Sequence, residues 1–158
     1  MTLWQKAALF LLRISMGSMF LYAGITKLMN PEWSAGDYLA SAKTFKGFYL
    51  FLAAPETVGA VSSLNEWALT LLGISLILGI FVRLSSVLGI ILMFLYYLPI
   101  LDFPYVGKSN FIVDQHVIYI FVLLYLAVVR AGRVFGLDPR CARLPLCRRL
   151  PRLRGWLG

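Results

Sequence analysis

Six ionisable side chains lie within or beside the long apolar segments of the chain: Arg13, Lys27, Glu66, Arg83, Asp114 and His116. A charged side chain at the centre of a bilayer costs at least ~2.5 kcal/mol on insertion scales, so such residues usually face protein or water. A buried cation and a buried carboxylate can neutralise one another by forming an ion pair. Ion pairing is therefore the simplest role for these six side chains. A half-buried pocket among aromatic and apolar side chains would instead recognise a small polar or anionic group, or a quinone head group.

The stretch from Arg13 to Lys27 reads RISMGSMFLYAGITK and lies within the first apolar segment. At about 100° per residue, Arg13, Gly17, Phe20, Gly24 and Lys27 fall within an arc of about 80° on a helix. One face of this helix, which we call its wall, therefore carries a cation at each end and small glycine residues in between. We expect Arg13 to be a buried ion-pair or ligand residue. Lys27 either shares that role or extends its ammonium to the membrane interface.

Glu66 has two interpretations, which depend on where its helix begins. The sequence Ser63-Leu64-Asn65-Glu66 has the pattern of a capping box, in which the Glu side chain returns to the cap amide. Nothing between Glu56 and Ser63 forbids helix, however. If the helix begins near Glu56, Glu66 becomes a buried acid.

Asp114 and His116 lie two residues apart near the start of the last apolar segment. On a regular helix they would point about 200° apart, so we expect one to face the bundle and the other a neighbouring helix or the interface. Asp114 could instead cap a helix that starts later, and His116 could simply be a hydrogen-bonded histidine.

Several chemistries lack support in the sequence. With His116 as its single histidine, the chain alone cannot supply the paired ligands of a bis-histidine haem. No HExxH, GxSxG, Walker A or GxGxxG pattern occurs, which argues against zinc proteolysis, serine hydrolysis and nucleotide binding. Cys141 and Cys147 match neither CxxC redox spacing nor a four-ligand metal set, and we assign them no role. Recognition of a small anion or a quinone remains.

The composition is typical of an integral membrane protein. Hydrophobic residues make up 60% of the 158 residues and the mean hydropathy is +0.80. Soluble domains are roughly 45–50% apolar. The apolar runs predict an all-α, integral membrane four-helix bundle over residues 1–130, with spans at about 3–28, 56–82, 84–101 and 111–130. Apolar residues at three- and four-residue steps after Ser34 predict a short amphipathic helix in the first outer loop, ending before Pro55.

An arginine-rich tail follows at residues 131–158, and it carries most of the net charge of +8. A basic tail beside a membrane span indicates a cytoplasmic location and contact with anionic lipid rather than nucleic acid. Lys6 and Arg83 fall on the same side of a four-span arrangement. The positive-inside rule therefore predicts that both termini are cytoplasmic.

Four parts of the chain together resemble the DoxX/DoxD family of small four-helix membrane proteins, over roughly residues 8 to 138. They are Arg13 with Gly17 and the AGITKL stretch around Lys27, Glu66 followed by LLGISLILGIFVR through Arg83, Asp114 with His116, and GRVFGLD from Gly132 to Asp138.

The resemblance implies a subunit of a quinone-linked oxidoreductase that passes electrons from a sulfur compound such as thiosulfate to membrane quinone. It implies the prokaryotic cytoplasmic (inner) membrane as the location. Partners would be membrane lipid and another oxidoreductase subunit, with a homo-oligomer as an alternative. Quinone is then the substrate, and no haem, metal or nucleotide is expected.

The same resemblance makes the six polar positions the candidate site. Glu66, Asp114 and His116 would be catalytic, with His116 or Glu66 delivering a proton. Arg13, Lys27 and Arg83 would bind the substrate and stabilise an anionic species. The alternative function is a non-catalytic membrane anchor or assembly scaffold for a redox enzyme, followed by a small-molecule or lipid transporter.

Overall fold

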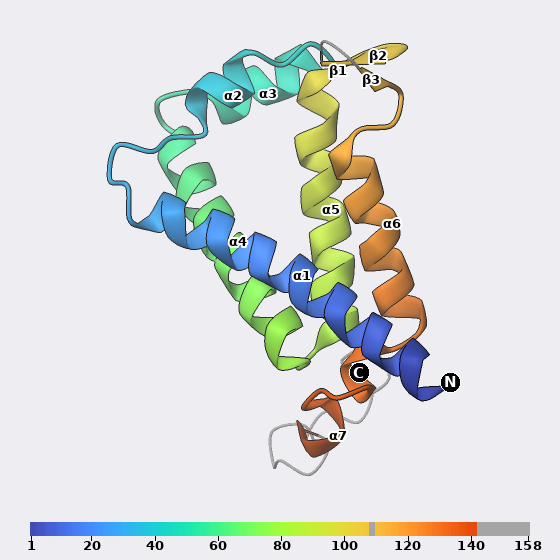
Figure 1. Ribbon diagram of the computed structural model, residues 1–158. Coiled ribbons are helices and arrows are strands. Elements are labelled where there is room, and N and C mark those ends of the chain that lie inside the picture. Colours follow the sequence, from blue (N-terminus) through green and yellow to red (C-terminus); the bar gives the residue numbers. More distant parts are fainter. Residues whose placement is uncertain (108–109, 142–158) are drawn as a thin grey trace.

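The computed structural model describes residues 1–107 and 110–141, and it is mostly helical (Figure 1). Three helices are long and apolar enough to cross a membrane: α1 (Leu3–Leu28), α4 (Val58–Leu78) and α5 (Val82–Ile100). About 20 residues at ~1.5 Å each suffice to span the hydrocarbon core of a bilayer. The fold is therefore that of a helical membrane protein.

A fourth apolar helix, α6 (Gln115–Val128), has only 14 residues. At ~1.5 Å per residue it is about 21 Å long, shorter than the hydrocarbon core of about 30 Å. The range expected from the sequence, 111–130, began too early because Asn110–Phe111 form strand β3 and Asp114 is the N-cap of α6.

The connection between α4 and α5 is a tight turn. Its left-handed backbone conformation was not predictable from the sequence. Helix α4 ends at Gly79, which has a φ of 68°, and Phe81 is also left-handed, with a φ of 55°. Helix α5 therefore begins at Val82, and Arg83 lies in its first turn rather than in the connection. At the other end of α4, the start at Val58 places Glu66 more than two turns inside the helix. The capping-box interpretation of Glu66 is thus wrong.

The long helices form two pairs, α1 with α4 and α5 with α6 (Figure 1). Glycines allow the first pair to approach closely: a Cβ at Gly73 would lie 2.7 Å from Leu21 Cα, and one at Gly24 would lie 2.9 Å from Thr70 Cα. Both pairs contribute to one apolar core, which includes Leu9, Phe20, Leu76, Leu123 and Leu126. The pairs meet at the α4–α5 turn and diverge from there (Figure 1).

Two short helices bridge the diverging ends of the pairs, α2 (Gly36–Ala40) and α3 (Lys46–Leu52) (Figure 1). A single amphipathic helix was expected here, but Phe45 has a φ of 52° and divides the segment in two. Ala42 and Tyr49 are buried as the periodicity suggested, whereas Phe45 is exposed. We refer to residues 33–52 as the cover.

The remaining elements lie at the two ends of the helix pairs. Strands β1 (Leu101–Asp102), β2 (Tyr105–Val106) and β3 (Asn110–Phe111) form a small antiparallel sheet between α5 and α6. A 3₁₀ turn (Ala131–Arg133) and α7 (Asp138–Cys141) follow α6. Most of the arginine-rich tail, residues 142–158 with Cys147, lies outside the described residues.

Candidate functional site

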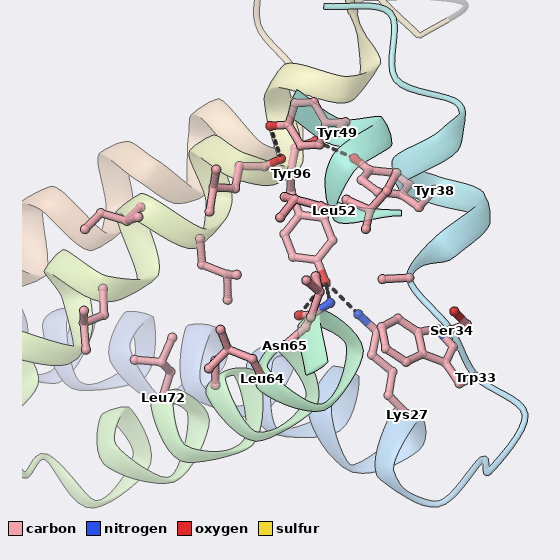
Figure 2. Close-up of a pocket in the computed structure, with 18 of the residues that line it drawn as sticks. Lys27, Trp33, Ser34, Tyr38, Tyr49, Leu52, Leu64, Asn65, Leu72 and Tyr96 are labelled. Atoms are coloured by element: carbon pink, nitrogen blue, oxygen red, sulfur yellow. Dashed lines mark hydrogen bonds between the residues drawn. The ribbon is translucent and has the colours of Figure 1, made fainter. Parts of the chain in front are cut away.

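A cavity of about 590 Å³ lies between α4 and α5, beneath the cover (Figure 2). This volume is within the range of ~300–1,000 Å³ typical of small-molecule sites. Most of its lining is aliphatic and comes from the facing sides of the two helices, including Leu64, Leu71, Leu72, Leu88, Ile91 and Leu95. The cavity therefore favours a ligand with a hydrocarbon part.

Three of the polar side chains that line the cavity meet at the Tyr96 hydroxyl (Figure 2). Lys27 Nζ donates a hydrogen bond to Tyr96 Oη at 2.8 Å. The amide of Asn65 meets the same hydroxyl, with Nδ2 at 2.6 Å and Oδ1 at 2.8 Å. Three helices, α1, α4 and α5, thus each place one polar group at this point. A polar head group bound at this point would contact side chains of all three helices.

Aromatic rings rather than carboxylates surround the Lys27 ammonium. Its Nζ lies 4.5 Å from the ring centroid of Trp33 and 5.2 Å from that of Tyr96, distances at which a ring face attracts a cation. Within residues 1–107 and 110–141, no carboxylate forms an ion pair with Lys27. Lys27 is half-buried and lines the cavity.

Pro99 explains how the cover is attached to α5. Proline lacks an N–H, so the Leu95 carbonyl one turn earlier loses its usual helical donor. Tyr49 Oη donates to this carbonyl at 3.0 Å, and Tyr38 Oη donates to the adjacent Tyr96 carbonyl. Two tyrosines of the cover therefore donate to α5 carbonyls in the turn before Pro99.

The Tyr38 hydroxyl is a donor at neutral pH, and burial extends this protonated form to higher pH. Loss of solvation raises the pKa of this phenol, and the nearby Tyr96, Tyr49 and Asp114 raise it further. Burial also raises the pKa of Tyr49. Both phenols thus remain protonated at neutral pH and continue to donate to α5.

Asp114 and His116 are joined to one another instead of pointing in opposite directions. Because α6 begins at Gln115, Asp114 is its extended N-cap, and Oδ1 accepts from the backbone N–H groups of His116 and Val117. Its other oxygen, Oδ2, lies 2.5 Å from His116 Nδ1. The expected angle of 200° assumed a regular helix through both residues, and that assumption does not hold. The alternative, in which Asp114 caps a helix that starts later, is confirmed.

The His116 imidazole stacks on the Tyr96 ring, with centroids 5.8 Å apart and an interplanar angle of 14°. Tyr96 lines the cavity and His116 does not. The Asp114 and His116 pair is therefore connected to the cavity through the ring of Tyr96.

Arg13 lies far from this cavity, at the end where the helix pairs meet, and it is fully buried. Its guanidinium donates to three backbone carbonyls of the segment after α6: Nη1 to Ala131 at 2.6 Å and to Val134 at 3.0 Å, and Nη2 to Phe135 at 3.1 Å. Asp138 is close enough to interact electrostatically with it. Arg13 thus holds the C-terminal segment against α1.

The glycines around Arg13 make room for this contact. A Cβ at Gly79 or Gly136 would lie 2.8 Å from Arg13 Nη1, and a Cβ at Gly132 would collide with the Asp138 carboxylate. Burial raises the pKa of Asp138, although the Phe81 N–H, which donates to Asp138 Oδ1 at 2.7 Å, and the nearby Arg13 oppose this rise. The GRVFGLD stretch is therefore matched to Arg13 in shape and charge.

Glu66 and Arg83 do not line the cavity. Glu66 is partly exposed on α4, and among residues 1–107 and 110–141 its carboxylate forms no hydrogen bond or ion pair. Arg83 is partly buried near the α4–α5 turn, at the opposite end of α5 from Tyr96. Of the six polar positions, the structure brings Lys27, Asp114 and His116 together around Tyr96.

Four residues at this point were missed by the sequence analysis: Trp33, Tyr38, Asn65 and Tyr96. All four are uncharged at neutral pH, so they are not among the ionisable residues that mark a site in an apolar segment. Asn65 gave a usable signal, because a carboxamide well inside an apolar helix needs a hydrogen-bond partner. The described residues contain no group of three or more His, Cys, Asp or Glu side chains able to hold a metal ion.

Comparisons with known proteins identify the family of the chain. No curated protein and no solved structure is significantly similar to it. The family model for DoxX matches residues 8–100, which include α1, the cover, α4 and α5, and with them every residue that lines the cavity. Since this match covers more than half of the sequence, the chain belongs to the DoxX family of membrane proteins.

Proposed function

We propose that this protein is the membrane subunit of a quinone-linked oxidoreductase and that quinone binds in the cavity between α4 and α5. The observation that carries the proposal is the division of the cavity into an aliphatic part and a hydrogen-bonding end at Lys27, Asn65 and Tyr96. A membrane quinone has the matching division, with a hydrocarbon chain and a ring that bears two carbonyl acceptors.

Lys27 is the residue best suited to the head group. An ammonium has three N–H donors, and one of them is used by Tyr96. The others are free to donate to a quinone carbonyl. A positive charge at this point also favours any anionic species formed as the ring accepts electrons.

The overall reaction adds two electrons and two protons to the quinone to give the quinol. In this proposal a partner subunit supplies the electrons from a sulfur compound such as thiosulfate. Lys27, Asn65 and Tyr96 bind and orient the ring, while His116 and Asp114 support Tyr96 from behind. In this proposal the chain crosses a prokaryotic cytoplasmic membrane four times, and both termini are cytoplasmic.

The experiment measures quinone affinity of the purified protein in nanodiscs, with Lys27→Met as the decisive variant. Hydrogen bonds to charged groups contribute about 1.5–3 kcal/mol, so we expect the affinity to fall by about 10- to 100-fold. Lys46→Met is the matched control, because Lys46 is exposed on α3 and does not line the cavity. A wild-type protein that binds no quinone, or equal affinities in the two variants, refutes the proposal.

A second function, a membrane anchor for a soluble redox enzyme, is favoured by the Arg13 contacts. These contacts hold the first residues of the arginine-rich tail in a defined position, as presentation of the rest of the tail to a partner requires. Deletion of residues 139–158 should then release the partner from purified membranes while quinone affinity stays unchanged. Retention of the partner after the deletion excludes the anchor role of the tail.

A further inference from the structure

The cover closes the cavity on one side. It is bound to α5 and its extension through Tyr49 Oη on the Leu95 carbonyl, the Lys43 N–H on the Pro99 carbonyl at 2.9 Å, and Thr44 Oγ1 on the Leu101 carbonyl at 2.6 Å. On the other helix pair, the Ala35 N–H donates to Ser62 Oγ of α4 at 3.0 Å. Opening the cover would break hydrogen bonds on both pairs.

The side of the cavity between α4 and α5 is not closed in this way. Several of the aliphatic residues that line it are also exposed on the surface, among them Leu64 at 72%, Leu71 at 58%, Leu88 at 48% and Ile91 at 54%. They lie on the membrane-spanning helices themselves, so in a bilayer this surface faces hydrocarbon. The two helices are joined at their turn and diverge away from it (Figure 1).

The position of the polar groups sets the orientation of a ligand. Lys27, Asn65 and Tyr96 lie at one end, and the aliphatic residues of α4 and α5 extend from there toward the exposed side (Figure 2). A head group held at Tyr96 would thus leave its chain pointing between α4 and α5. A cavity of about 590 Å³ accommodates a ring and the first part of a chain, while a longer chain continues into the lipid.

From these observations we infer that the cavity takes a lipid-borne molecule with a hydrocarbon chain, which enters and leaves sideways between α4 and α5 while the cover stays in place. This inference rests on the proposed function only for the identity of the head group. The route itself depends on the exposed aliphatic side and the attached cover.

The test follows binding of a decyl-benzoquinone that carries a diazirine on its chain, with decanol bearing the same diazirine as a second probe. The variant Leu71→Trp with Leu88→Trp fills the opening, and we expect association of the probe to slow by about tenfold or more. The matched control is Leu78→Trp with Leu84→Trp, because these residues are exposed on the same two helices but do not line the cavity. After irradiation, the label should appear on α4 and α5.

A covalent tether between the cover and β1 tests directly whether the cover must move. Lys43 and Asp102 form an ion pair at 3.0 Å on the surface, so cysteines at these positions can be joined by a short bis-maleimide, with Cys141 and Cys147 replaced by serine. We expect association to change by less than about twofold, since the cover need not move. Association that is blocked by the tether but unaffected by the tryptophans overturns the sideways route.

The two probes separate this inference from the proposed function. If decanol labels cavity-lining residues of the wild type, if the tryptophans at Leu71 and Leu88 prevent that labelling, and if the benzoquinone does not bind, the head group is wrong and the route stands. If the benzoquinone binds through Lys27 and the tryptophans leave its association unchanged, the route is wrong and the proposed function stands.

Discussion

Replacing Arg13 by methionine should destabilise the fold without weakening ligand binding. Methionine keeps much of the apolar stem but donates no hydrogen bond, so the carbonyls of Ala131, Val134 and Phe135 lose a donor and Asp138 loses a neighbouring cation. A hydrogen bond from a charged group contributes about 1.5–3 kcal/mol, so the loss of these donors should cost at least about 3 kcal/mol. Since domains are stable by only about 5–15 kcal/mol in total, this is a large share.

The assay is reversible unfolding in mixed detergent micelles, followed by circular dichroism, together with quinone affinity of the folded fraction. Asp138→Asn and the double variant complete a thermodynamic cycle, in which the double variant should cost about 0.5–3 kcal/mol less than the sum of the single changes. The exposed Lys46→Met should stay within about 0.5 kcal/mol of the wild type. If Arg13→Met is as stable as Lys46→Met and yet binds no quinone, Arg13 is a substrate-binding residue and our structural assignment fails.

Three further predictions concern other parts of the molecule. Gly73→Ala should lower the free energy of unfolding by about 1–3 kcal/mol in the same assay, because the added Cβ meets the backbone of α1. Gly59→Ala on the same helix is the control, since its Cβ meets nothing, and it should raise the stability by up to about 1 kcal/mol. Equal effects of the two changes would contradict the close approach of α1 and α4. Burial raises the pKa of Asp138, so the folded state retains a proton that the unfolded chain releases above about pH 4, and stability should fall as the pH rises through the folded value. Asp138→Asn should remove this fall above about pH 4, and an unchanged pH profile would contradict it. His116→Phe should keep quinone affinity through stacking on Tyr96 while His116→Ala loses it, and equal losses would show that the imidazole nitrogens are needed.

The helical membrane character of the protein was predictable because it depends on local composition. Apolar runs of about 20 residues leave a chain few alternatives, and the structure has three such helices. The small residues on the wall of α1 were also visible in the sequence. Gly24 on that wall does lie in close contact with Thr70 of α4.

The break in the cover and the start of α6 were not predictable in the same way. Phe45 adopts a left-handed backbone that its residue type does not favour, and the packing of Tyr49 against α5 on one side of it requires that turn. Phe111 opens an apolar run that is typical of a helix, but it pairs with Tyr105 of β2. In both places contacts distant in sequence overrode the local pattern.

Local composition and short motifs are enough to identify a DoxX-family membrane protein with charged residues inside its apolar segments. Which of those residues meet depends on how the helices pack. Arg13 and Lys27 lie on one wall of α1, yet Arg13 binds backbone carbonyls at one end and Lys27 faces a cavity at the other. The physical reason is that helix pairing sets the partner of each side chain. That pairing depends on close packing between segments far apart in the chain, such as Gly73 against Leu21, which local periodicity does not encode.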